Sequence, residues 1–238
     1  MKYIKTCEQF KGITFREWLK EIPELVWWSK MHAWREKPDI TRIDCSYSNL
    51  IDLDGIEQFT NLRELYCSGN KLTQLPDLPK TLEVLYCDNN ILTQLPNLPN
   101  TLIMMLCDYN HLTQLPDLPN TLDLYCSNNQ LTQLPDLPNT LKRLYCKHNQ
   151  LIQLPDLPNT LEVLRCSYNK LTQLPNLPDT LKELDCSFNQ LQQLPDLPDI
   201  LERLYCTNNQ LPYNDLEGYW KWFEKTYPEK IAAKKYNL

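Results

Sequence analysis

Cysteine thiols are the residues of this chain that could bind a metal or carry redox chemistry, and nine of the ten recur at a nearly constant spacing. The nine are Cys45, Cys67, Cys87, Cys107, Cys126, Cys146, Cys166, Cys186 and Cys206. Zinc needs ligands that converge, whereas this period places the thiols parallel in a row. Parallel Cβ vectors also oppose disulfides between neighbours. We therefore expect free thiols, Cys7 included, that pack as small hydrophobic side chains, and we expect no metal and no cofactor.

No other set of residues has the pattern of a catalytic site. His32, His111 and His148 are far apart in the sequence, and the acidic residues are scattered. Because a nucleophile, a base and an orienting group do not occur together, we expect a protein without enzyme activity.

The cysteines lie in the frame Leu-x-x-Leu-x-Cys-x-x-Asn-x-Leu, which recurs over residues 40–211 and predicts an array of nine repeats. In one repeat, a short strand over 84–88 would point Leu85 and Cys87 inward and Tyr86 outward. Stacked strands of this kind would form one parallel sheet on the concave side. The predicted fold class is an α/β repeat solenoid.

Proline shapes the opposite side of the predicted solenoid. The phrase Leu-Pro-Asp/Asn-Leu-Pro recurs from Leu75 to Pro198. Proline removes amide donors and fixes φ, which excludes helix from this part of each repeat. We expect an extended, polyproline-like convex side and a solenoid with only gentle curvature.

Asparagine follows eight of the cysteines by three residues. These positions are Asn70, Asn90, Asn110, Asn129, Asn149, Asn169, Asn189 and Asn209. The chain must turn there inside the stack, and an amide side chain can both donate to and accept from the backbone of neighbouring turns. The asparagines are therefore interpreted as structural.

Helical caps are expected at both ends, over residues 1–39 and 212–238, because an open array would expose its last apolar layers. Thr14-Phe15-Arg16-Glu17 is a capping-box pattern, and Pro23 opens a second helical pattern that ends before Pro38. At the C-terminal end, the apolar residues at helical spacing are Leu216, Tyr219, Trp220 and Phe223. Both ends could instead be docking helices for another protein.

Two departures from the period have structural consequences. The first repeat, from Ile40, lacks the double proline, which predicts a helical turn on its convex side. The segment before Cys126 is one residue shorter than its counterparts. Either the sheet is disturbed there or the preceding bend is shorter.

These repeats resemble the short bacterial class of leucine-rich repeat, over about residues 40–211. The phrase Leu-Pro-Asp-Leu-Pro-Asn-Thr-Leu-Lys-Arg-Leu-Tyr-Cys, at 134–146, resembles the repeats of YopM and of IpaH-type effectors, while residues 40–61 resemble internalin-type repeats. Cysteine followed by Asn-Gln-Leu-Thr is also similar to repeat proteins of environmental bacteria and giant DNA viruses. IpaH-type ligases carry a catalytic domain with a nucleophilic cysteine after the repeats, and residues 212–238 contain no cysteine. The resemblance therefore implies a scaffold of the YopM kind and no ligase activity.

The net charge of the repeats indicates which class of molecule the chain is not expected to bind. The repeats carry eleven Lys/Arg against twenty Asp/Glu, a net charge of −9, which argues against nucleic acid. No apolar run is long enough to predict a membrane span, and residues 1–8 lack the apolar core of a signal peptide. We expect an intracellular site of action, in the cytoplasm of its own cell or of a host cell, with export by a signal-less route left open.

The outward positions of the concave sheet can vary without harm to the core, and we expect a partner protein to bind there. The candidate binding residues are Tyr66, Val84, Tyr86, Met104, Leu106, Tyr125, Arg143, Tyr145, Arg165 and Tyr205. Two alternatives stay open. Tyrosine pairs can stabilise adjacent strands without any partner, and the tyrosine strip or the tryptophan-rich ends can pack on a second copy in a homo-oligomer. For Arg165, we expect an ion pair with Asp185 on the next strand.

Overall fold

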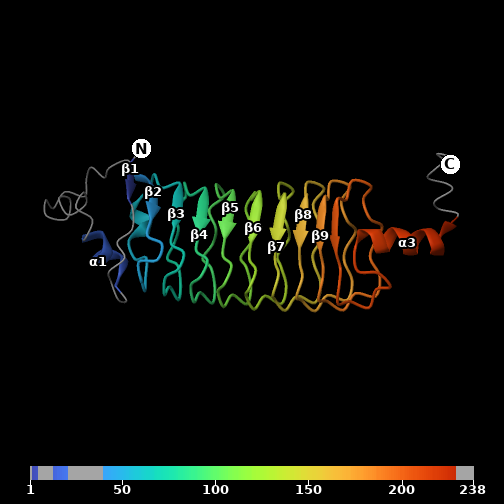
Figure 1. The fold of residues 1–238 in the computed structure, drawn as a ribbon. Helices are drawn as coiled ribbons and strands as arrows, with labels where there is room; N and C mark the ends of the chain where they lie inside the picture. Colours follow the sequence, from blue (N-terminus) through green and yellow to red (C-terminus); the bar gives the residue numbers. More distant parts are fainter. Residues whose placement is uncertain (1, 5–12, 21–39, 229–238) are drawn as a thin grey trace.

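The computed structural model describes residues 2–4, 13–20 and 40–228, which form an elongated solenoid with little curvature (Figure 1). Ten strands make one parallel sheet in the order of the chain. The strands are β1 (Lys2–Ile4), β2 (Ile40–Asp44), β3 (Glu64–Tyr66), β4 (Val84–Tyr86), β5 (Met104–Leu106), β6 (Asp123–Tyr125), β7 (Arg143–Tyr145), β8 (Val163–Arg165), β9 (Glu183–Asp185) and β10 (Arg203–Tyr205). The helices are α1 (Phe15–Lys20), the 3-10 turn η1 (Ile56–Gln58) and α3 (Leu216–Thr226). The predicted parallel solenoid is confirmed, and α1 and α3 lie at its two ends (Figure 1).

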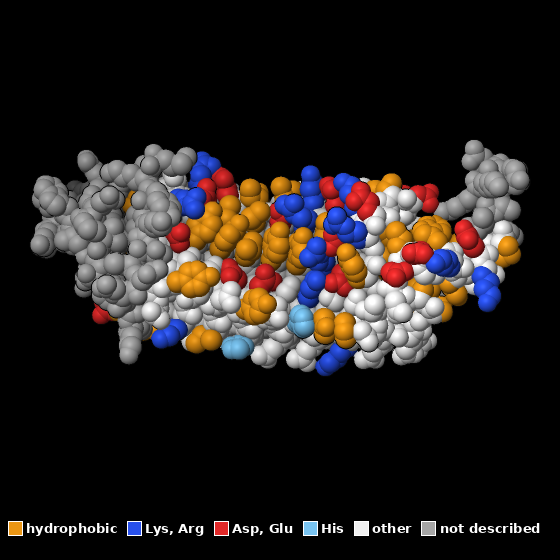
Figure 2. All heavy atoms as spheres, in the orientation of Figure 1, with side chains coloured by type: hydrophobic (Ala, Val, Ile, Leu, Met, Phe, Trp, Pro, Cys, Tyr) orange, Lys and Arg blue, Asp and Glu red, His pale blue; other side chains and the backbone are white. Residues whose placement is uncertain are grey.

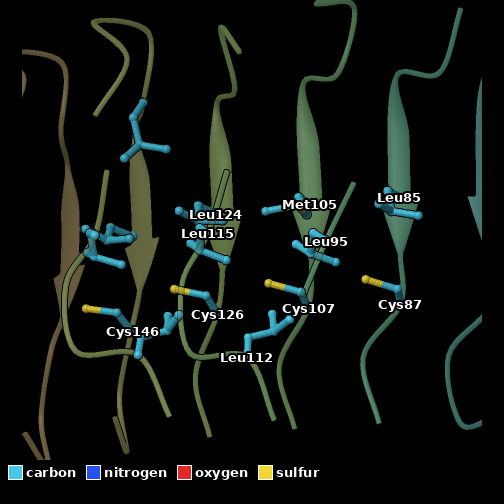
Figure 3. Close-up of a cluster of buried hydrophobic side chains, with 14 of the residues drawn as sticks. Leu85, Cys87, Leu95, Met105, Cys107, Leu112, Leu115, Leu124, Cys126 and Cys146 are labelled. Carbon is cyan, nitrogen blue, oxygen red and sulfur yellow. The ribbon is translucent and has the colours of Figure 1, made fainter. Parts of the chain in front are cut away.

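Each turn of the solenoid buries the same kind of side chain. In the turn of β4, Leu85 and Cys87 are fully buried, while Val84 and Tyr86 remain partly exposed. Figure 3 shows Leu85, Met105 and Leu124 in one row across successive strands, and Cys87, Cys107, Cys126 and Cys146 in a second row parallel to it. Because side chains alternate along a strand, the middle residue of each strand from β3 to β10 points into the core, and the residues on either side of it face outward.

The convex side is extended, as the prolines predict. Among residues 40–211, η1 is the one helical turn on the return path, and it occurs in the first repeat, where a helical turn is expected. Gly55 precedes it with a φ of 103°, a left-handed conformation that glycine adopts without steric cost. In the later turns the return path has no helix to widen it, which explains the small curvature.

The asparagine row binds the backbone of successive turns together. The amide of Asn110 donates to the carbonyl oxygens of Cys87 and Cys107 at 3.0 and 3.2 Å, and its Oδ1 accepts the N–H of Leu92 at 3.0 Å. The seven other asparagines also donate to the carbonyls of two cysteines. The predicted double role of this amide is confirmed.

The N-terminal end combines the expected helix with an unexpected strand. The N–H of Thr14 donates to the Glu17 carboxylate at 2.9 Å, and the N–H of Glu17 donates to the Thr14 hydroxyl at 3.2 Å, so the capping box forms. Phe15 is fully buried. The expectation of a purely helical cap missed β1, which adds a parallel strand beside β2. The predicted helix between Pro23 and Pro38 lies outside the described residues.

The C-terminal end carries the expected amphipathic helix, α3. Its first turn is capped by Asp215, whose Oδ1 accepts the N–H of Gly218 at 2.7 Å. Tyr219 and Phe223 are its buried residues, and both contact the ring of Trp220. The boundaries given above for the two caps stay predictions.

The short repeat leaves the sheet intact and alters the bend before it. β5 and β6 pair in unbroken register. Because one residue is missing, Thr121 occupies the buried position that Leu102 holds in the preceding turn. Among the described residues, the hydroxyl of Thr121 has no hydrogen-bond partner. Of the two alternatives, the shorter bend is correct.

Candidate protein-binding surface

Seven of the candidate residues form one continuous band, here called the concave strip, on the outward face of β3 to β7. The concave strip consists of Tyr66, Val84, Tyr86, Met104, Leu106, Tyr125 and Tyr145, all of them partly exposed. Strand pairing places Tyr86 beside Tyr66 and Leu106, and Tyr125 beside Leu106 and Tyr145. Figure 2 shows the band as a hydrophobic area that ends at a group of Lys and Arg side chains.

Tyrosine rings contact each other at both ends of the concave strip. The rings of Tyr66 and Tyr86 meet edge to face at 4.7 Å, and those of Tyr125 and Tyr145 stack at 4.5 Å. Leu106 separates the two pairs. Such contacts stabilise the sheet by roughly 0.2 to 1 kcal/mol per pair, so part of the role of the tyrosines is structural.

An arginine lies over the last tyrosine ring at each end of the concave strip. The Cζ atom of Arg42 is 4.5 Å from the centre of the Tyr66 ring, and that of Arg165 is 5.2 Å from the Tyr145 ring. Arg42 also pairs with Glu64 at 3.2 Å. Burial and the hydrogen bond to Glu64 raise the pKa of Tyr66 to about 12, so its hydroxyl stays a donor at neutral pH.

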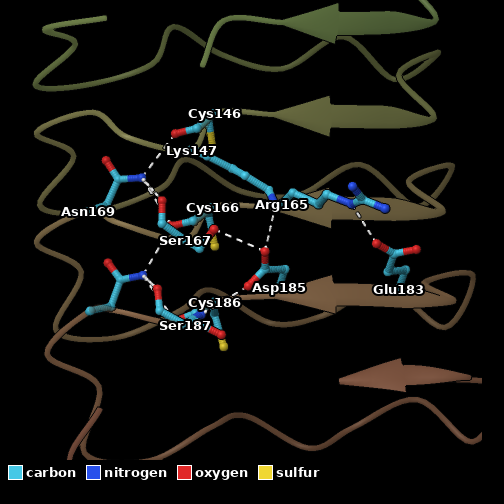
Figure 4. A network of polar contacts seen from close by, with 11 residues as sticks. Cys146, Lys147, Arg165, Cys166, Ser167, Asn169, Glu183, Asp185, Cys186 and Ser187 are labelled. Carbon is cyan, nitrogen blue, oxygen red and sulfur yellow. Dashed lines mark hydrogen bonds and ion pairs between the residues drawn. The ribbon is translucent and has the colours of Figure 1, made fainter. Parts of the chain in front are cut away.

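Beyond the concave strip, charged side chains pair with each other. Arg165 pairs with Glu183 at 2.5 Å, while Asp185 binds Lys147 at 2.7 Å (Figure 4). The expected partner of Arg165 was therefore wrong, because its guanidinium reaches diagonally to Glu183 on β9, while Asp185 binds Lys147. Glu183 also binds Arg203 at 3.3 Å.

The remaining candidates differ in their surroundings. Arg143 lies at the border of the concave strip, and its guanidinium holds the buried carboxylate of Asp123 on β6. Tyr205 is 51% exposed but stands on β10, separated from Tyr145 by two charged strands. The structure thus brings Arg143 and Arg165 to the strip and leaves Tyr205 apart from it.

Two carboxylates lie beside the middle of the concave strip and have no cationic partner in the part of the chain that the structure describes. Asp88 accepts hydrogen bonds from the hydroxyl of Ser68 and, at 2.7 Å, from the amide of Asn89. Asp108 accepts the N–H of Ser127 at 2.5 Å. Burial, with a further contribution from Asp88, raises the pKa of Asp108 to about 6. A positively charged group of a partner would stabilise the ionised carboxylates of Asp88 and Asp108.

A second row of aromatic residues was not identified from the sequence. Two residues after each cysteine the chain turns with positive φ, and five of these positions carry a ring: Tyr47, Tyr109, His148, Tyr168 and Phe188. His148 stacks on Tyr168, and Tyr168 on Phe188, each at 4.1 Å. The signal was present, because the same position holds Gly69 and asparagines in other repeats. Left-handed backbone disfavours bulky side chains, so these rings are not explained by the turn itself.

The thiols have the properties of core residues. All nine cysteines of the repeats are buried free thiols, and burial raises the pKa of each one, for Cys146 to about 12. The Cys107 thiol contacts the carbonyl oxygen of Tyr125 at 3.2 Å. A protonated, buried thiol is a poor nucleophile. Over the described ranges, no group of three or more His, Cys, Asp or Glu could hold a metal, and no helix is long and apolar enough to cross a bilayer.

Comparisons with known proteins agree with this architecture. A family model described as Leucine Rich repeats (2 copies) matches residues 38–80 and 60–100. The functional domain of InlJ from Listeria monocytogenes, which includes a cysteine ladder, is 34% identical with a TM-score of 0.67, and the match covers 75% of this chain and 42% of that one. The leucine-rich-repeat domain of a Shigella effector is 27% identical with a TM-score of 0.53, over 83% and 84% of the two chains.

YopM, a leucine-rich effector protein from Yersinia pestis, is 30% identical with a TM-score of 0.48, over 72% of this chain and 62% of that one. The chain thus spans less than two thirds of the InlJ domain and of YopM. A search of curated proteins finds no match.

Proposed function

Since the chain is a leucine-rich-repeat protein with repeats of the bacterial type, we propose that it is a non-catalytic scaffold that binds a partner protein on the concave strip. Leucine-rich-repeat solenoids generally present an extended surface for binding other proteins. The proposal assigns that role to one part of the sheet.

The observation that supports this assignment is the exposure of an unbroken band of rings and aliphatic side chains on a rigid sheet. A soluble protein rarely leaves such a continuous apolar area on its surface without a use. Tyrosine suits an interface because it offers a large contact area and a hydroxyl group at a small loss of conformational entropy. Next to the concave strip, on β8 and β9, the charged side chains of Arg165, Glu183 and Asp185 already bind other side chains of the chain.

The test removes the centre of the concave strip while leaving the core intact. In the variant Tyr86→Ser/Leu106→Ser/Tyr125→Ser, we expect affinity capture of the partner to fall at least tenfold, since buried aromatic and aliphatic anchors commonly contribute about 2 kcal/mol each. Capture is measured by quantitative mass spectrometry on immobilised wild-type and variant protein.

The matched control is Ile91→Ser/Ile152→Ser/Ile200→Ser, which removes three exposed apolar side chains away from the concave strip. We expect unchanged capture for this control and a cooperative thermal transition for both variants by circular dichroism. Equal capture by the strip variant and the wild type, with both folded, would refute the proposal. A dilution series in the analytical ultracentrifuge identifies the case in which the strip is occupied by a second copy.

A further inference from the structure

The two ends of the concave strip show how this surface holds a guanidinium group. At one end Arg42 lies over the ring of Tyr66, and at the other Arg165 lies over the ring of Tyr145. Both arginines also pair with a glutamate on a neighbouring strand. Each cation thus has a tyrosine ring, whose face attracts positive charge, and a carboxylate; Glu64 lies on the strand of the ring, and Glu183 lies on the far side of Arg165 from the ring.

The middle of the concave strip repeats the ring and the carboxylate but not the cation. Asp88 and Asp108 follow Tyr86 and Leu106 by two residues, so strand alternation puts them on the same outward face. In the described part of the chain, neither aspartate pairs with a lysine or arginine. Asp108 accepts the backbone N–H of Ser127 through Oδ1.

We propose that the middle of the concave strip receives an arginine of the partner protein, with its guanidinium on the ring of Tyr86 and its N–H groups bound by Asp88 and Asp108. This inference rests on the proposed function and specifies the chemistry of the partner. Arginine fits better than lysine, because its planar fork can stack on a ring and bind two carboxylates at once.

Apolar side chains must stand next to this arginine in the partner. Leu106 and Met104 lie between the tyrosine pairs; the leucine side chain forms no hydrogen bonds, and the Met104 sulfur already accepts the hydroxyl of Tyr86 at 3.1 Å. The partner segment therefore combines an arginine with at least one aliphatic or aromatic neighbour. The negative charge of the repeats would attract such a basic segment over a longer range.

The test uses the full chain as bait for a phage-displayed library of random dodecapeptides. We expect the selected peptides to be enriched in arginine next to an apolar residue, and replacement of that arginine by glutamine to weaken binding at least about tenfold. The double variant Asp88→Asn/Asp108→Asn should weaken binding by a similar factor, measured by fluorescence anisotropy with a labelled peptide. Binding should also weaken as NaCl is raised.

The matched control is Asp117→Asn/Asp136→Asn, which makes the same change of charge at two exposed aspartates of the convex bends. It should leave the affinity within about twofold. Peptides without a basic residue, or peptides that bind Asp88→Asn/Asp108→Asn as well as wild type, would overturn the inference while leaving the proposed function in place. Peptides that bind the strip variant Tyr86→Ser/Leu106→Ser/Tyr125→Ser as well as wild type would refute both.

Discussion

The two halves of the concave sheet share one interior but differ in their outward side chains. On β4 and β5 the outward face carries rings and aliphatic groups, and Asp88 and Asp108 just after these strands pair with no cation in the described part of the chain. From Asp123 on β6 to β9, the carboxylates pair with Arg143, Lys147 and Arg165. Behind both halves run the same leucines, cysteines and asparagines. The shared interior therefore keeps the strands in register in both halves, while the halves differ in how many outward groups already bind side chains of the described chain.

The largest effect is expected in the shared interior, where the two halves should behave alike. Asn110→Ala and Asn149→Ala, in the turns of β5 and β7, each leave one buried N–H without its acceptor and remove one of the two amide donors of two cysteine carbonyls. We expect each substitution to lower the free energy of unfolding by about 2 to 4 kcal/mol. Urea unfolding followed by circular dichroism measures both. A much smaller loss of unfolding free energy for one of the two variants would show that the interiors of the two halves differ.

Asp108 and Asp185, one carboxylate from each half, should affect the stability of the fold in opposite directions. The pKa of Asp108 is raised from 3.8 to about 6, so the folded protein holds a proton between these pH values that the unfolded chain has released. Stability therefore falls as pH rises through this window, and the penalty is fully present at pH 7. Asp108→Asn removes it and should stabilise the fold at pH 7 by about 1 kcal/mol, a figure reduced for partial exposure to solvent.

Asp185 should show the opposite sign. Burial disfavours its charge, but the hydrogen bond and the charge of Lys147 outweigh this and lower its pKa. Its stabilising contribution is present above the ordinary pKa of aspartate and is lost as pH falls through the lowered value. Asp185→Asn should therefore destabilise the protein at pH 7. Thermal unfolding at pH 4 and 7 checks both variants. A change in melting temperature in the same direction for both variants at pH 7 would contradict the prediction.

An effect of similar size is expected at the shortened bend before β6. Thr121→Val removes a buried hydroxyl that has no partner and should stabilise the protein by about 1 kcal/mol. Thr160→Val is the matched change in the other half, where the hydroxyl donates to the carbonyls of Asn139 and Leu141 at 2.9 and 2.8 Å. It should destabilise by about the same amount. Differential scanning calorimetry compares the two, and a loss of stability in Thr121→Val would contradict the assignment.

The sequence predicted the repeating parts of the fold because each repeat poses the same packing problem. The parallel sheet, the buried cysteines, the asparagine row and the extended convex side all follow from one frame. β1 was missed because residues 2–4 lie outside that frame, and their pairing depends on a contact with β2 far along the chain. The effect of the missing residue could not be decided either, because a strand and a bend can both absorb it.

The concave surface was less predictable than the core. Strand alternation identified which residues face out, and hence the concave strip, but it does not fix the direction of long side chains. Arg165 could reach either Asp185 or Glu183 from its position, and the lysine that occupies Asp185 decides the outcome. The ring stack of His148, Tyr168 and Phe188 was missed because a left-handed turn is not visible in hydrophobic periodicity. Binding by these outward groups could not be read from the repeat frame, because it depends on the side chains of a second molecule.

The most direct test of that proposal is site-specific crosslinking. Benzoyl-phenylalanine is placed at Leu106, in the centre of the concave strip, and in a second variant at Ile152, an exposed position outside the strip. After irradiation with the captured partner, we predict a covalent adduct from position 106 and none above background from position 152. An adduct from position 152 with none from position 106 would contradict the assignment of the concave strip as the binding surface.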